Sequence, residues 1–199
     1  MNPHEELEIK FKADGVDFKS FNTYLNNNFN KIKKRHVTCP DVYYIKDKDV
    51  VRHRYSEDAG ELTIKQRKSS ESTLDRLEID LKFHKDVTKE NVEAFLVALG
   101  FKVKFILNKD SYIYHIIRRE SGIESVLAYY TVGTNDNDIK SFIEVEIEKS
   151  NNINKAEAFK ELKWWNKELK FNVGVGTPLN ESLYEIYSGE KYKNAKISD

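Results

Sequence analysis

The first residues that suggest chemistry are the charged side chains of the opening stretch, residues 4–12. Charged and apolar residues alternate there, so a strand would place Glu6, Glu8 and Lys10 together on one face. A strand of this kind usually forms the edge of an antiparallel sheet and turns its charges toward water. The alternative is a strand whose charges line a polar cavity that binds metal and phosphate.

The same alternation recurs in four further stretches, where the opposite positions are largely apolar. The charged positions are Arg52 and Arg54, then Lys65 and Arg67, then Arg76, Glu78 and Asp80, then Glu144, Glu146 and Glu148. The first and last strands are acidic and the middle ones basic, whereas a solvated face favours mixed signs. Helical stretches with wide apolar stripes are available to cover the apolar face. The pattern therefore favours charges that point inward.

The chemistry follows from the ligand preferences of these groups. The acidic positions are Glu6, Glu8, Glu144, Glu146 and Glu148. Carboxylates without Cys or His partners suit a hard ion, Mg²⁺ or Mn²⁺, and Mg²⁺ is usually shared between carboxylates and substrate phosphates. The basic positions repel one another unless an anion lies among them. A closed barrel with a ligand inside would satisfy both sets.

The positioning elements can be outlined from periodicity. Helical spacing occurs in residues 16–29, 88–100, 154–170 and 177–189, and roughly eight stretches have extended character. For the last helix, Thr177 is the expected N-cap and Pro178 the first helical residue. No linker or repeat interrupts the chain. We expect one α+β domain over residues 1–189, with mostly antiparallel strands, and a frayed tail over residues 190–199.

The composition excludes several classes of protein. Lys and Arg together number 33, as do Asp and Glu, so overall basicity cannot drive nucleic-acid binding. No apolar run approaches ~18 residues, so no membrane partner is expected. An acidic N-terminus argues against a signal peptide, and the single Cys39 fits a reducing compartment. The expected location is the cytoplasm, and both monomer and homodimer remain open.

The charged motifs, taken in order, resemble those of the CYTH domain, or triphosphate tunnel metalloenzyme, superfamily. The resemblance covers residues 5–188. The matching elements are Glu6-x-Glu8-x-Lys10, Asp41-x-Tyr43-Tyr44, Arg52-x-Arg54, Leu62-x-Ile64-Lys65, Arg76-x-Glu78, Lys109, Phe142-x-Glu144-x-Glu146 and the closing stretch Ser182-Leu183-Tyr184-Glu185-Ile186-Tyr187. No single element is specific, but their common order makes coincidence an unsatisfactory explanation.

The resemblance implies an eight-stranded antiparallel closed β-barrel, a tunnel with a charged interior and helices packed outside, that binds a triphosphate and one or two divalent metals. The implied metal ligands are Glu6, Glu8, Glu144 and Glu146, with Glu78 and Glu148 as further candidates. The implied phosphate ligands are Lys10, Arg52, Arg54, Lys65, Arg67, Arg76 and Lys109. Lys65 and Tyr43 correspond to a pair that activates water in some members. A lysine serves as a base only if burial or nearby cations lower its pKa.

Two positions depart from the family pattern. The later basic element usually reads Lys-x-Arg, but Ser111 occupies the position of the arginine. A family aspartate is replaced by Ala128. Arg118 or Arg119 is a candidate to replace the missing arginine.

Three functions are compatible with this set of residues. The first is metal-dependent hydrolysis of inorganic triphosphate, thiamine triphosphate, a nucleoside triphosphate or an RNA 5′-triphosphate end, the last being the one expected contact with nucleic acid. The second is an adenylyl cyclase of the CYTH type, which would release pyrophosphate from ATP. The third, motivated by Ser111 and Ala128, is a non-catalytic module that binds a nucleotide or polyphosphate.

Overall fold

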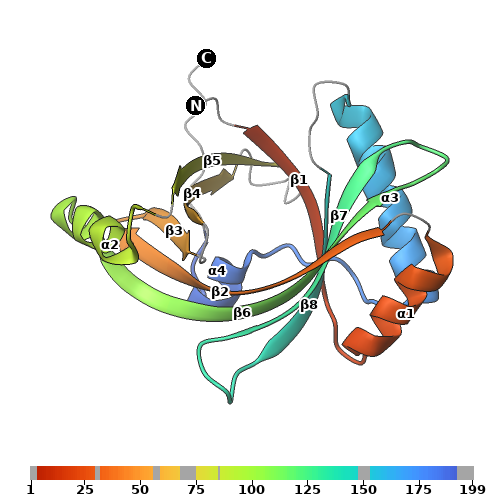
Figure 1. Ribbon diagram of the computed structural model, residues 1–199, viewed down its shortest axis with the longest axis horizontal. Coiled ribbons are helices and arrows are strands. Elements are labelled where there is room, and N and C mark those ends of the chain that lie inside the picture. Colours follow the sequence, from red (N-terminus) through yellow and green to blue (C-terminus); the bar gives the residue numbers. More distant parts are fainter. Residues whose placement is uncertain are drawn as a thin grey trace.

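The computed structural model describes residues 4–29, 32–55, 59–67, 75–84, 86–147 and 153–191, with side chains excepted at 4–6, 32, 59, 65–67 and 75–77. The strands are β1 (His4–Lys12), β2 (Ile32–Lys46), β3 (Asp49–Tyr55), β4 (Ala59–Arg67), β5 (Asp75–His84), β6 (Lys102–Ile117), β7 (Glu124–Gly133) and β8 (Lys140–Ile147). The helices are α1 (Phe18–Asn28), α2 (Lys89–Ala98), α3 (Lys155–Asn172) and α4 (Leu183–Ser188). Figure 1 shows their arrangement.

All eight strands pair in antiparallel fashion. In order of pairing they run β1-β5-β4-β3-β2-β6-β7-β8, and β8 pairs again with β1. The predicted α+β class and the eight antiparallel strands are therefore confirmed. Within the residues that the structure describes, the β1–β5 ladder joins residues 4–7 to residues 75–78, whereas β1 pairs with β8 over residues 7–12. Strand β1 therefore pairs with β5 on one side and with β8 on the other.

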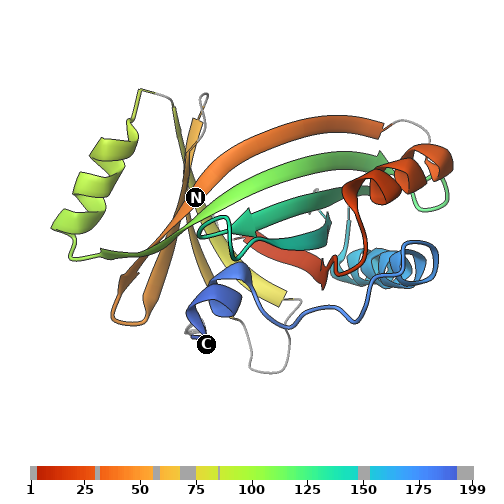
Figure 2. The ribbon, with the colours of Figure 1, turned by 90° about the horizontal axis from the view of Figure 1, so that it is seen from below.

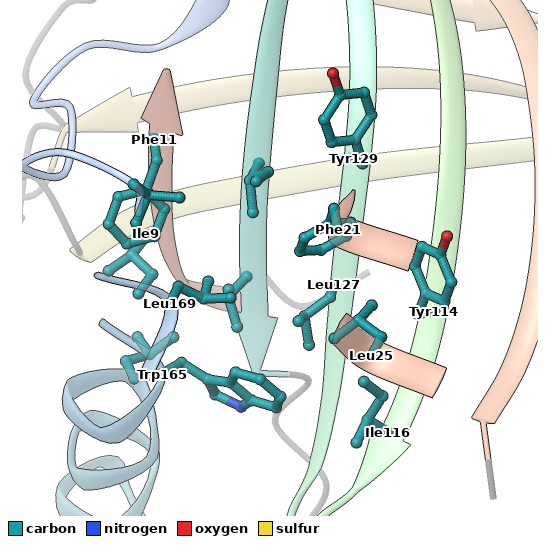
Figure 3. Packing of buried hydrophobic residues seen from close by; sticks show 14 of the residues in the cluster. Ile9, Phe11, Phe21, Leu25, Tyr114, Ile116, Leu127, Tyr129, Trp165 and Leu169 are labelled. Atoms are coloured by element: carbon teal, nitrogen blue, oxygen red, sulfur yellow. The ribbon is translucent and has the colours of Figure 1, made fainter. Parts of the chain in front are cut away.

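Three helices cover the apolar outer face of the sheet, as the alternation predicted. Helices α1 and α3 pack on β1, β6, β7 and β8 through a cluster that includes Phe21, Leu25, Trp165 and Leu169 (Figure 3). Helix α2 packs at the other end, through Val92 and Leu96, on β2 and β3. Figure 2 shows α2 at the opposite end of the sheet from α1 and α3. Burial of these side chains supplies most of the driving force for the arrangement.

Helix α4 begins later than the sequence predicts. Thr177 and Pro178 do not start it; Ser182 is the N-cap, in a capping box with Glu185. The expected early start was wrong because the preceding segment is held against the first strand, where the backbone N–H of Leu179 donates to the carbonyl of Lys10 at 2.7 Å. The predicted end is confirmed, since Gly189 has a left-handed φ of 71°. No helix among the described residues is both long and apolar enough to span a membrane.

Candidate functional site

The inner face of β1 and β8 carries a lysine between glutamates, here called the β1–β8 cluster and consisting of Glu8, Lys10, Glu144 and Glu146. Register pairs Glu8 with Glu146 and Lys10 with Glu144. The Lys10 ammonium lies 3.4 Å from Glu8 Oε1 and 3.1 Å from Glu144 Oε2. Glu8 and Lys10 are only 3% and 6% exposed. The cluster therefore places one cation among three carboxylates, largely away from water.

Tyr130 and Lys109 extend this cluster along the inner faces of β7 and β6. The Tyr130 hydroxyl donates to Glu144 Oε2 at 2.9 Å, and the Lys109 ammonium lies 3.7 Å from the centre of the Tyr130 ring. Burial, together with the charge of Glu144, raises the pKa of Tyr130 well above its usual value. Burial and then the charge of Arg54 lower the pKa of Lys109 to about 8. Lys109 is thus a cation that loses its charge around pH 8.

A second group, the arginine cluster, lies on β2, β3 and β4 and consists of Asp41, Arg52, Arg54, Glu61 and Thr63. Arg54 binds Asp41 through two parallel hydrogen bonds, Nε to Oδ1 at 2.7 Å and Nη2 to Oδ2 at 2.8 Å. Asp41 is fully buried. Burial alone would raise its pKa, but the charges of Arg54 and Arg52 outweigh burial and hold the pKa of Asp41 well below its usual range. This geometry is the strongest form of a charged pair.

Arg52 connects the arginine cluster to β4 and β5. Its Nη2 donates to Glu61 Oε1 and to Thr63 Oγ1, both at 2.8 Å, and lies 3.9 Å from Glu78 Oε1. The Thr63 hydroxyl donates in turn to Asp80 Oδ1 at 2.7 Å. Burial opposes ionisation of Glu61, but the charges of Arg52 and Arg54 lower its pKa overall. Arg52 and Arg54 are therefore held by carboxylates of the protein.

This arrangement corrects one expectation from the sequence. Adjacent arginines were expected to need an external anion, but Asp41 and Glu61 balance them from neighbouring strands. The sequence reasoning also missed Glu61, Thr63 and Tyr130 as members of the site. The signal was present for all three, since they share the inner parity of their strands. The alternation of one strand does not show which residues of the neighbouring strand lie opposite, so the partners of these side chains could not be predicted.

Most predicted site residues with described side chains lie on this inner face. They are Glu8, Lys10, Tyr43, Arg52, Arg54, Glu78, Lys109, Glu144 and Glu146. The side chains of Glu6, Lys65, Arg67 and Arg76 lie outside the described set, as does all of Glu148. Backbone register nevertheless places Glu6 and Arg67 opposite Arg76, and Lys65 opposite Glu78. The backbone thus brings these positions next to the two clusters.

Tyr43 lies at the end of the inner face that α4 covers. It is buried, and its ring centre lies 4.9 Å from that of Phe105 and 5.9 Å from that of Tyr184. Tyr184 belongs to α4 and is itself buried. Tyr43 is also the cross-strand partner of Arg52. An apolar cluster that includes Leu107 and Phe142 therefore fills this end, next to the charged groups.

Arg118 and Arg119 are not on the inner face. The guanidinium of Arg118 lies 3.4 Å from the centre of the Trp164 ring and its Nε lies 3.3 Å from Glu161 Oε1, both on α3. Because α3 covers the outer face, Arg118 cannot replace the arginine missing at Ser111. Arg119 is exposed in the turn after β6. The suggestion that Arg118 compensates was therefore wrong.

The donor set fits a hard divalent cation. Glu8, Glu144 and Glu146 offer carboxylate oxygens on adjacent strands, which is the ligand type that Mg²⁺ and Mn²⁺ prefer. Within the described side chains, no group of three or more acidic, His or Cys residues is already gathered around a common point. Lys10 instead bridges two of the carboxylates. A metal would have to take these oxygens from Lys10.

Comparisons with known proteins agree with the sequence motifs. The chain matches the family model of the CYTH domain over residues 4–174. The PH1819 protein of Pyrococcus horikoshii OT3 has a similar structure, with a TM-score of 0.65 and 20% identity over 94% of this chain and 99% of that one. For the PH1012 protein of the same organism the TM-score is 0.60 and the identity is 19%, and the match covers 90% of this chain and 98% of that one. A chain of the Schizosaccharomyces pombe Mediator head module has a TM-score of 0.51 and an identity of 9%, and the match covers 88% of this chain and 100% of that one.

These structural likenesses support the fold alone, because the sequence identities are low. No curated protein sequence matches the chain.

Proposed function

Because the chain belongs to the CYTH domain family, we propose that it hydrolyses a triphosphate with the help of Mg²⁺ or Mn²⁺. In this proposal the ring of eight paired strands forms a tunnel, and the β1–β8 cluster and the arginine cluster face each other across it. The substrate is a small-molecule triphosphate or the 5′-triphosphate end of an RNA. The proposed site comprises the groups already described on the inner face.

The observation that carries the proposal is the concentration of buried charge on the inner face. Glu8, Lys10 and Asp41 are nearly inaccessible to water, in a part of the sheet that could have been filled with apolar side chains. Removing charges from water costs several kcal/mol per ion, and apolar replacements are often as stable. Charges retained under these conditions indicate a site that serves binding or chemistry.

The two clusters supply the two halves of phosphoryl-transfer chemistry. Glu8, Glu144 and Glu146, with Glu6 by family pattern, would hold the metal, which when bound neutralises phosphate oxygens. Lys10 would then be released from the carboxylates and point its charge at a phosphate. Arg52, Arg54 and Lys109 offer further donors; Lys65, Arg67 and Arg76 join them by family pattern. Phosphoryl transfer needs mainly such positioning and charge neutralisation.

Water activation is assigned to Lys65 with Tyr43, again by family pattern. Lys65 is the cross-strand partner of Glu78 and lies two residues from Thr63, which pairs with Arg52. The surrounding cations would lower the pKa of Lys65 and allow it to accept a proton from water. Replacing Lys65 with Ala should lower turnover more than substrate binding. Equal losses in both would refute its role as a base.

The function is tested by incubating the protein with inorganic triphosphate, thiamine triphosphate, ATP and a 5′-triphosphorylated RNA, each with Mg²⁺ or Mn²⁺. Release of orthophosphate that stops when the metal is chelated supports the proposal. Cyclic AMP with pyrophosphate from ATP would identify a cyclase instead. Tight binding of an intact ligand, with no product in any reaction, would identify a binding module and refute hydrolysis.

A further inference from the structure

One part of the inner face is apolar and, apart from its edge beneath α4, is not covered by any helix of the described residues. It consists of Val37, Ile113, Val126 and Ala128, here called the inner apolar patch. Cross-strand register pairs Ile113 with Ala128, places Val37 diagonal to Ile113, and puts Val126 next to Ala128 on the same face. All four side chains are half-buried. The patch therefore spans β2, β6 and β7.

The patch is separate from the apolar cores. Helices α1 and α3 pack on the opposite face of the same strands, against Tyr114, Leu127 and Tyr129. Within the described residues, Val37, Ile113 and Val126 take part in none of the three core clusters, and Ala128 lies at the edge of the one beneath α4. A partly exposed apolar area inside an otherwise charged site is a feature of a ligand surface, and packing among the described residues does not account for this one.

Charged groups border the patch on both sides. Arg35 is the cross-strand partner of Ile113, and Glu144 is the cross-strand partner of Ala128. Such partners lie about 5 Å apart. Lys109 lies four residues before Ile113 on β6, about 13 Å along the strand. A ligand resting on the patch would therefore have its phosphates beside the β1–β8 cluster and Lys109.

We infer that the inner apolar patch binds the organic group of the substrate, so that the protein selects an organic triphosphate ester over inorganic triphosphate. The inference rests on the proposed function and sharpens its substrate class. Inorganic triphosphate consists of anionic oxygens and phosphorus, so apolar side chains offer it no favourable contact. A ring or sugar attached to the phosphate chain would bury both its own apolar surface and that of the patch.

Two variants and one matched control test this inference. Ile113→Asn makes the patch polar with a smaller side chain, and Ala128→Leu fills space that the organic group would use. Ile106→Asn is the control, because Ile106 lies on the same strand, has the opposite parity and is already exposed. Values of kcat/KM are measured with ATP, thiamine triphosphate and inorganic triphosphate.

The parent protein should prefer at least one of the two organic substrates over inorganic triphosphate by about tenfold or more. Ile113→Asn and Ala128→Leu should each lower kcat/KM for that substrate about tenfold, mainly through KM, and leave inorganic triphosphate nearly unchanged. The control should change neither. Preference of the parent for inorganic triphosphate would overturn the inference. Equal losses with both kinds of substrate in the two variants would also overturn it.

Binding separates this inference from the proposed function. Calorimetry with β,γ-imido ATP and with inorganic imidotriphosphate gives the same comparison without turnover. Absence of hydrolysis together with tighter binding of the nucleotide analogue would refute the proposed function and retain the role of the patch. Hydrolysis together with equal binding of the two analogues would support the proposed function and refute the role of the patch. The ratio of the two affinities is measured on the parent protein alone, so this test does not depend on whether a variant folds.

Discussion

The two charged clusters inside the sheet differ in the geometry of their charged contacts. In the arginine cluster, Arg54 and Asp41 form a two-bond pair and Arg52 has carboxylate and hydroxyl partners. In the β1–β8 cluster the described contacts of the Lys10 ammonium are single and longer, 3.4 Å to Glu8 and 3.1 Å to Glu144. The first cluster is therefore built to hold its geometry. The second brings the carboxylates of adjacent strands together through looser contacts, which suits it to exchange a cation.

This difference predicts that the arginine cluster matters most for stability. Arg54→Ala leaves the buried carboxylate of Asp41 without its principal partner, which should reduce the free energy of unfolding by about 3–5 kcal/mol. Urea denaturation followed by circular dichroism measures the change. Arg119→Ala, at an exposed arginine, is the control and should change the free energy of unfolding by less than about 0.5 kcal/mol. Similar values for the two variants would remove the distinction between the clusters.

The β1–β8 cluster should matter most for activity. Glu8→Gln removes a proposed metal ligand while Lys10 keeps Glu144, so kcat/KM should fall at least about a hundredfold at saturating Mg²⁺. The free energy of unfolding should stay within about 1 kcal/mol of the parent, because Lys10 keeps its contact with the Glu144 carboxylate. Turnover assays and urea denaturation on the same preparation check both values. Full activity in Glu8→Gln would disprove its assignment as a metal ligand.

Lys109, between the clusters, should make binding depend on pH. Its pKa of about 8 in the free protein means that the side chain loses its proton above about pH 8. A bound triphosphate favours the charged form, so binding takes up a proton there and affinity falls by up to about tenfold per pH unit. Calorimetry with imidotriphosphate from about pH 6.5 to about pH 9.5 measures this decline.

Lys109→Arg is the matched variant for this prediction. Arginine keeps its charge over the whole range, so its affinity should be nearly independent of pH. If the variant declined as steeply as the parent, the pH dependence would belong to another group.

The smallest effect is expected at Tyr130, which supports the β1–β8 cluster through one hydrogen bond to Glu144. Tyr130→Phe removes that bond but leaves Glu144 paired with Lys10. We expect a loss of about 1 kcal/mol in the free energy of unfolding and a few-fold weaker affinity for Mn²⁺. Titration of Mn²⁺ by electron paramagnetic resonance gives the affinity. A loss as large as that of Glu8→Gln would mean that Tyr130 itself is part of the metal site.

The inner and outer faces could be predicted because alternation is a local property. From Glu6 in β1 and from Glu144 in β8 every second residue is charged, and in the structure Leu7, Ile9 and Val145 are buried on the outer side, as expected. The partners of the arginines could not be predicted in the same way. Asp41 and Glu61 reach Arg54 and Arg52 only through the registers of β2–β3 and β3–β4. Register depends on the whole sheet and leaves no local signal.

The errors have the same origin. Thr177 and Pro178 form a good helix start when considered alone, but a backbone hydrogen bond from Leu179 to β1 holds this segment outside the helix. Arg118 looked available from its position after β6, yet the sequence gives no sign that Trp164 of α3 lies over it. In both cases a contact between distant segments overrides a local preference.

The central claim, that the two clusters hold a metal and a triphosphate between them, is tested most directly by a crystal structure with Mn²⁺ and imidotriphosphate. An anomalous Mn²⁺ peak is expected at about 2.1 Å from oxygens of Glu8 and Glu144. Phosphates are expected within hydrogen-bond distance of Arg52, Arg54 or Lys109, with Lys10 turned from the carboxylates to a phosphate. Metal and phosphates bound on the outer face, or Lys10 still bridging Glu8 and Glu144 beside a bound ligand, would contradict this arrangement.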